Sequence, residues 1–114
     1  MREHLQANIE QTVLRNLLTD EKYMRKVLPF IKPEYFQGVY RNLFKEAGKY
    51  VAKYNTLPTA ETLVIELDET HSFTDDQYRM AMDIIPRLYT CEVIDQDWLL
   101  DATEKWCQDR ALYN

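Results

Sequence analysis

Three carboxylates near the end of the chain are the side chains whose spacing could most readily support catalysis. Asp97, Asp101 and Glu104 occupy positions i, i+4 and i+7, which places them on one face of a helix. Two carboxylates can divide the roles of acid and base when their surroundings differ. Asp97, however, falls in the first turn of the expected helix, where negative charge is favourable, and Asp101 can pair with Lys105 one turn on. A solvated face is therefore the favoured interpretation, and we predict no catalytic residue.

Nucleotide and metal chemistry are also not expected from the residues present. Gly38 and Gly48 are the only glycines, so neither a G-x-x-x-x-G-K-[ST] loop nor a G-x-G-x-x-G turn can be built. His4 and His71 are isolated from each other and from the cysteines, without the spacing of zinc ligands. We predict that this chain by itself hydrolyses no ATP, is not an enzyme, and needs neither a metal nor a cofactor.

The composition is that of one ordinary globular domain. The chain has 114 residues, of which 46% are hydrophobic and 29% charged, and it has no apolar run of the ~20 residues that cross a bilayer. Its start lacks the apolar stretch of a signal peptide. We therefore expect a cytoplasmic protein that makes no membrane contact. Cys91 and Cys107 form no C-x-x-C pair and are either free or bridged, with reduced structural thiols favoured.

The net charge of −5 hides a division along the chain. Residues 1–57 carry ten Lys and Arg against six Asp and Glu, net +4, whereas residues 58–114 carry four against thirteen, net −9. Such asymmetry suits contact between copies or two different partners, and it also suits two solvated charged faces.

Four basic residues recur at every fourth position in the helix expected over residues 37–54. They are Arg41, Lys45, Lys49 and Lys53, and together they could lie along a phosphate backbone. An acidic protein or solvent would satisfy the same charges. We take these four as the candidate partner-binding residues.

The elements that position these side chains are all expected to be helical, because strand-type alternation is nearly absent. We predict an all-α compact bundle of about six helices. The expected ranges are 2–18, 21–28, 37–54, 60–67, 75–88 and 95–114. Asp20, Thr59, Thr74 and Asp95 are the expected caps, and Thr74 with Gln77 matches a capping box. Pro86 predicts a kink or an early end near Ile85.

The last helix is capped at its start but has no encoded stop, so we expect it to continue in a longer parent. If the core ends near Trp98, then Trp106 and Tyr113 project past it and need another surface to bury them. The alternative is that the helix folds back onto its own domain. Under the first reading, the candidate assembly residues are Trp106, Arg110, Leu112 and Tyr113.

Several segments resemble one family in order along the whole chain. They are Lys26-Val-Leu-Pro-Phe-Ile-Lys-Pro-Glu-Tyr-Phe36, Lys53-Tyr-Asn-Thr-Leu-Pro-Thr59, Trp98-Leu-Leu, Thr103-Glu-Lys-Trp106 and Arg110-Ala-Leu112. The sequence is similar to the N-terminal domain of DnaB-type replicative helicases, with the T-even-type phage versions most alike. The resemblance implies a helical collar on a hexameric ring, while ATP and Mg²⁺ are bound by a separate motor domain absent from this chain.

On that resemblance, residues 1–94 form a globular head, and residues 95–114 form the first helix of a truncated hairpin through which N-terminal domains pair. The implied work is ring assembly and docking of primase and a helicase-loading protein, with DNA passing through the parent ring. Two alternatives remain from other classes of protein: a free-standing small helical DNA-binding protein that uses the basic helix, and a phage regulator that binds a host factor.

Overall fold

The computed structural model describes residues 8–70, 73–90 and 92–113, and these residues form helices and loops without a β-strand. The α-helices are α2 (Ile9–Thr19), α3 (Glu21–Val27), α4 (Val39–Tyr54), α5 (Ala60–Thr70), α6 (Asp75–Leu88) and α7 (Gln96–Tyr113). Two short 3-10 helices, η1 (Leu28–Phe30) and η2 (Pro33–Tyr35), lie between α3 and α4. The predicted all-α fold is confirmed.

Short polar side chains set the helix starts, because they accept hydrogen bonds from backbone N–H groups that have no partner inside the helix. The predicted caps Asp20, Thr59, Thr74 and Asp95 each accept such a bond from the backbone three residues on, at 3.1 Å. Gln77 completes the capping box by accepting from the backbone N–H of Thr74 at 3.0 Å. Local sequence therefore determines where four of the helices begin.

The first predicted helix is wrong at one point. Asn8 has an extended backbone (φ −105°, ψ 104°), and its side chain accepts from the N–H groups of Glu10 and Gln11 at 3.0 and 3.2 Å. Helix α2 therefore starts at Ile9 and is not the end of an unbroken helix from residue 2. The rest of that prediction lies in residues 1–7, outside the described residues.

Helix α6 continues through Pro86 to Leu88, which confirms the predicted range 75–88 and excludes the early end near Ile85; the alternative, a kink at this point, stays a prediction. Proline removes one backbone hydrogen bond in a helix interior. Pro86 lies in the last turn of α6, so the helix continues for only two residues, Arg87 and Leu88, past the missing bond. Leu88 is fully buried, and its packing favours completing the last turn.

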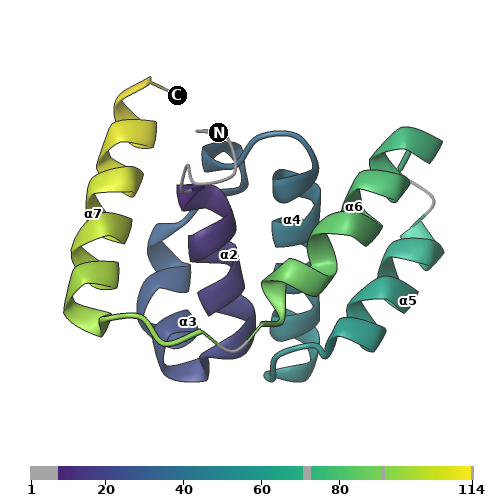
Figure 1. Ribbon diagram of the computed structural model, residues 1–114, viewed down its shortest axis with the longest axis horizontal. Coiled ribbons are helices and arrows are strands. Elements are labelled where there is room, and N and C mark those ends of the chain that lie inside the picture. The colour runs from purple at the N-terminus through teal and green to yellow at the C-terminus, as the bar shows by residue number, and fades with distance from the viewer. Residues whose placement is uncertain (1–7, 71–72, 91, 114) are drawn as a thin grey trace.

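Helix α2 is the central element, and it packs against α3, α4, α6 and α7 (Figure 1). Its Val13 and Leu14 are completely buried, and Leu17 and Leu18 nearly so. Helices α5 and α6 lie on one side of α2, and α7 lies on the other. The molecule therefore has one hydrophobic core, built around a helix from the start of the chain.

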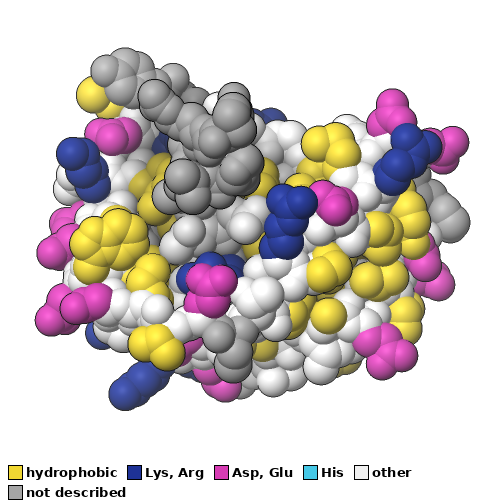
Figure 2. Space-filling model, viewed as in Figure 1, with side chains coloured by type: hydrophobic (Ala, Val, Ile, Leu, Met, Phe, Trp, Pro, Cys, Tyr) yellow, Lys and Arg dark blue, Asp and Glu magenta, His cyan; other side chains and the backbone are white. Residues whose placement is uncertain are grey.

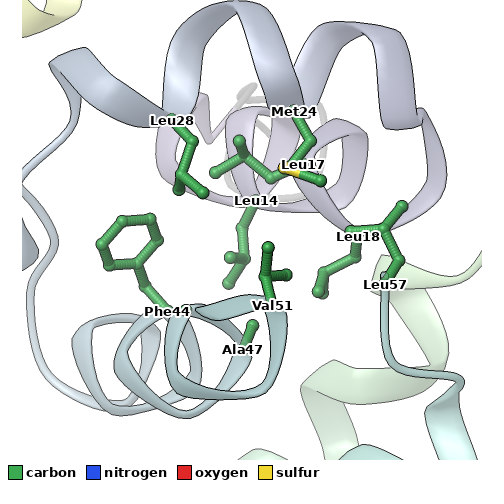
Figure 3. Close-up of a pocket in the computed structure, with 10 residues that line it drawn as sticks. Leu14, Leu17, Leu18, Met24, Leu28, Phe44, Ala47, Val51 and Leu57 are labelled. Atoms are coloured by element: carbon green, nitrogen blue, oxygen red, sulfur yellow. The ribbon is translucent and has the colours of Figure 1, made fainter. Parts of the chain in front are cut away.

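A small apolar cavity of about 10 Å³ remains where α2, α3 and α4 meet (Figure 3). Leu14 and Met24 lie on one side of it, and Ala47 and Val51 on the other. Gly48 of α4 also lines the cavity. A cavity of this size and lining lies at the lower limit for holding one water molecule, and it offers no polar partner.

The two glycines should respond in opposite directions to alanine. A Cβ would meet no atom within 4 Å at either position, but Gly38 has φ +57° whereas Gly48 lies inside α4. We expect Gly48→Ala to raise the free energy of unfolding by ~0.5–1 kcal/mol, through lower unfolded-state entropy and better helix propensity. Gly38→Ala should lower it by ~1–2 kcal/mol, because positive φ is strained for alanine. Urea unfolding followed by circular dichroism measures both, and two shifts of the same sign would contradict this account.

Candidate functional site

Helix α7 is attached to the rest of the chain by four side chains on its inner face. Leu99, Thr103, Trp106 and Arg110 are spaced at i, i+4, i+7 and i+11, so they share one face of the helix. Helix α7 packs against α2 and η2. The described residues up to 94 are called the head below, and the four side chains are called the docking stripe.

Trp106 is the largest member of the docking stripe, and it is buried within its own chain. Its ring lies 6.0 Å from that of Tyr35 at 84° and 4.9 Å from that of Phe36 at 59°, between ring centroids. The side chain is 6% exposed. The expectation that Trp106 projects past the core is therefore wrong, and the alternative that the helix folds back onto its own domain is confirmed. Tyr35, at the end of η2, and Phe36, which follows it, supply the surface that buries Trp106.

The indole of Trp106 is held by packing alone. Its Nε1 is buried and has no hydrogen-bond partner in the part of the chain that the structure describes. A buried donor left unpaired costs ~1–3 kcal/mol. The apolar and edge-to-face contacts of the ring must therefore exceed this cost to keep α7 docked.

Thr103 supplies the polar contact in the middle of the docking stripe. Its hydroxyl donates to the carbonyl of Leu99 at 2.7 Å and lies 2.6 Å from the phenol oxygen of Tyr23. Because the Thr103 proton is used on Leu99, the Tyr23 hydroxyl is the donor in the second bond. Burial raises the pKa of Tyr23 from 10.0 to about 12, so this donor keeps its proton well above neutral pH.

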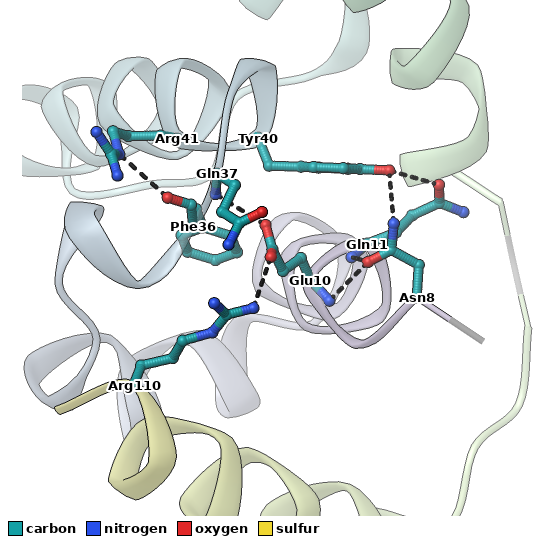
Figure 4. A network of polar contacts seen from close by, with 8 residues as sticks. All are labelled: Asn8, Glu10, Gln11, Phe36, Gln37, Tyr40, Arg41 and Arg110. Atoms are coloured by element: carbon teal, nitrogen blue, oxygen red, sulfur yellow. Dashed lines mark hydrogen bonds and ion pairs between the residues drawn. The ribbon is translucent and has the colours of Figure 1, made fainter. Parts of the chain in front are cut away.

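Arg110 forms the fourth contact, an ion pair with a residue at the start of α2. Its Nη2 donates to Oε2 of Glu10 at 2.8 Å, and Oε1 of Glu10 accepts from the backbone N–H of Gln37 at 2.9 Å (Figure 4). Glu10 is 7% exposed. One carboxylate therefore joins α2, the segment before α4 and the far end of α7. A separate contact beside it links Tyr40 to Gln11 at 3.1 Å.

The predicted assembly residues thus lie in different surroundings. Trp106 and Arg110 contact the head, whereas Leu112 is 75% exposed. The side chain of Tyr113 lies outside the described residues. Trp98, near which the core was expected to end, is 54% exposed because it lies one position from the docking stripe. An assembly role for these residues stays a prediction.

Glu10, Tyr23 and Thr103 were missed by the sequence reasoning. Glu10 and Tyr23 lie in the first part of the chain, 100 and 80 residues from their partners on α7. No local pattern indicates such a contact. Thr103 alone carried a signal, since it falls at helical spacing between Leu99 and Trp106.

The candidate partner-binding residues lie on one helix and all four are exposed. Arg41 donates to the carbonyl of Phe36 at 3.1 Å, Lys49 pairs with Glu46 at 3.2 Å, and Lys53 lies 5.3 Å from the ring centroid of Tyr54. Lys45 makes no ion pair with any described residue. A four-residue spacing turns ~40° per step on an α-helix, so the row winds ~120° around α4. It suits a curved partner better than a straight one.

The other residues considered for chemistry fall as follows. Asp97, Asp101 and Glu104 are all exposed, which confirms the solvated face. Cys107 is free and half-buried, and burial raises its pKa. Cys91, His4 and His71 lie outside the described residues. Within residues 8–70, 73–90 and 92–113, no group of His, Cys, Asp or Glu is placed to hold a metal ion.

No helix in the described part of the chain is long and apolar enough to span a membrane.

Comparison with known proteins identifies a relative. No protein-family model matches the chain. The chain is 34% identical over 105 residues to a DnaB-like replicative helicase of Enterobacteria phage T4. The match covers 91% of this chain and 22% of that helicase, so the chain spans about a fifth of its relative's length. The resemblance predicted from the sequence is confirmed: the chain is similar to part of a DnaB-like replicative helicase of a phage.

Proposed function

We propose that the chain is the N-terminal assembly domain of a hexameric, ATP-dependent replicative DNA helicase. The observation that carries this proposal is the match to the phage T4 DnaB-like helicase over only 22% of that protein. A segment of that size, without a phosphate loop in its sequence, has room for one helical domain but not for a nucleotide-hydrolysing motor as well.

In this proposal the domain works by contact and not by chemistry. Residues 1–94 act as the head of a collar, and α7 is the first arm of a hairpin that continues in the parent protein. Leu112 is exposed at the far end of α7, where a continuing hairpin or a neighbouring copy would cover it. Primase and a helicase-loading protein are the proposed docking partners of the collar. ATP and Mg²⁺ belong to the motor domain of the parent.

Deleting residues 1–114 from the full-length parent tests this proposal. We expect the intact protein to form a hexamer with ATP and Mg²⁺, and the shortened protein to bind nucleotide while losing the stable hexamer. Light scattering after size-exclusion chromatography measures the mass, and a fluorescent nucleotide measures binding. A shortened protein that keeps both the hexamer and its response to primase would contradict an assembly role.

A second function, contact with nucleic acid, is favoured by the basic row on α4. All four side chains are exposed, and Lys45 has no acidic partner among the described residues. Phosphate contacts of this kind release counterions, so binding should weaken steeply as salt increases. DNA displaced by the parent ring is the proposed ligand of this face.

Replacing Lys45 with glutamate tests the basic row. We expect Lys45→Glu to weaken binding of single-stranded DNA. Because one phosphate contact is lost, the slope of log affinity against log salt concentration should fall in magnitude by about one. Lys105→Glu is the matched control, because Lys105 is exposed on α7 and the change in net charge is the same. Fluorescence anisotropy at several salt concentrations measures both variants. Equal losses in the two would show that net charge, and not this face, governs binding.

A further inference from the structure

A groove of about 540 Å³ runs between α3 with η1 on one side and α7 on the other. The groove-lining side of α7 is adjacent to the docking stripe and shares only Thr103 with it. Its lining is Lys26, Val27, Phe30, Leu100, Thr103, Glu104, Cys107, Gln108 and Ala111. From Leu100 to Ala111 the groove follows α7 for three turns, or ~16 Å. Phe30, which stands at its wall, is 71% exposed.

The two walls of the groove carry opposite charges. On α7, Glu104 lines the groove, and Asp97 and Asp101 lie outside the lining on the same exposed face of the helix, so that together they form an acidic edge. Acidic side chains gather along the α7 side of the molecule (Figure 2). On α3, Lys26 lines the groove and Lys22 lies one turn before it, outside the lining, and the two form a basic edge. None of these five side chains forms an ion pair within the described residues, and all five are exposed. Both edges are therefore available to a partner.

This pattern makes the surface complementary to itself. When two copies meet groove to groove about a two-fold axis along the groove, α3 of each copy lies over α7 of the other. Lysines then face carboxylates twice. A two-fold axis across the groove would instead place α7 over α7, with carboxylate against carboxylate, which is unfavourable. Charge complementarity thus selects one arrangement of two identical chains.

We propose that this groove, called the α3–α7 groove, is an interface between two copies of this chain related by a two-fold axis along it. Phe30 of each copy enters the apolar floor of the other, and Lys26 of each copy pairs with Glu104 of the other. The inference rests on the proposed assembly function and names the surface that serves it. It places the contact on the groove side of α7, while Trp106 and Arg110 hold the other side to the head.

Charge reversal tests the proposed interface at the α3–α7 groove, because reversing both partners of an ion pair should restore the contact that each single reversal removes. In Lys26→Glu or Glu104→Lys, two attractive contacts per dimer become repulsive, and we expect dimerisation of the 114-residue chain to weaken by about tenfold. The double variant, with both changes in one chain, restores opposite charges and should recover the original affinity. An equimolar mixture of the two single variants should form heterodimers for the same reason. Sedimentation equilibrium over a range of concentrations measures each case.

Several results would overturn the inference. One is a chain that stays monomeric up to its solubility limit. Another is a dimer that neither single reversal weakens, or whose affinity the double variant fails to restore.

Phe30→Ala should also weaken the dimer, whereas Trp98→Ala should not, because Trp98 is an exposed aromatic residue outside the groove. Because all the charged positions are exposed, urea midpoints should confirm intact folding in every variant. If the inference fails while the full-length hexamer still requires residues 1–114, the assembly function stands and this surface alone is wrong.

Discussion

Replacing Trp106 with alanine is expected to lower the free energy of unfolding by ~3–5 kcal/mol, the usual loss when a buried aromatic side chain is removed. The ring is 6% exposed and packs on both Tyr35 and Phe36, so the variant leaves a cavity at the junction of α7 and η2. The loss of packing between α7 and the head should exceed the gain from removing the unpaired indole N–H. Urea unfolding followed by circular dichroism measures the change.

Trp98 provides the matched control for this prediction. It is the other tryptophan of the same helix, about two turns before Trp106, and it is 54% exposed. We expect Trp98→Ala to change the free energy of unfolding by at most ~1 kcal/mol. Equal effects of the two substitutions would mean that α7 is not docked on the head as described.

Replacing Glu10 with alanine should cost ~2–4 kcal/mol. The change leaves the guanidinium of Arg110 partly buried without its partner and leaves the backbone N–H of Gln37 without an acceptor. The Arg110 side chain is 27% exposed and can reach some water, which keeps the expected loss below that of a fully buried pair. Thermal or urea unfolding measures the loss.

Two comparisons isolate the contact made by Glu10. Glu92→Ala removes another ion pair between residues far apart in the sequence, with Arg15 at 3.5 Å. Because Glu92 is largely exposed, we expect a change of at most ~1 kcal/mol. A double-mutant cycle of Glu10→Ala and Arg110→Ala should show coupling of ~1–3 kcal/mol. Additive effects in that cycle would show that the pair does not hold α7 to the head.

Helix starts could be predicted from the sequence because their causes are local. Asp20, Thr59, Thr74 and Asp95 each satisfy a backbone donor only three residues away. Asn8 obeys the same rule, but the apolar spacing on either side of it favoured an unbroken helix. Hydrophobic periodicity and capping give conflicting signals there, and the cap determines the boundary that the structure shows.

The docking of α7 could not be predicted, because its contacts join residues far apart in sequence. Glu10 has the features of an ordinary surface acid in the first turn of a helix, yet it is buried by a segment before α4 and by Arg110. For Trp106, the sequence indicated only that some surface must bury its side chain. Deciding between a partner and its own head required knowing that the connector folds η2 toward α7.

The docked position of α7 also bears on the proposed assembly function. One side of the helix is used within the chain, through Trp106 and Arg110. The other side lines the α3–α7 groove and remains open in a single copy. A helix with this division can hold its own domain together and still present a surface to another chain.

The length of the natural polypeptide shows whether these 114 residues are one domain of a ring helicase or a free-standing protein. They match about a fifth of the phage T4 relative. Sequencing the reading frame past Asn114 provides the measurement. We predict an open frame several times longer than this chain, containing a G-x-x-x-x-G-K-[ST] phosphate loop. A stop codon directly after Asn114 would contradict the claim and favour a free-standing regulator.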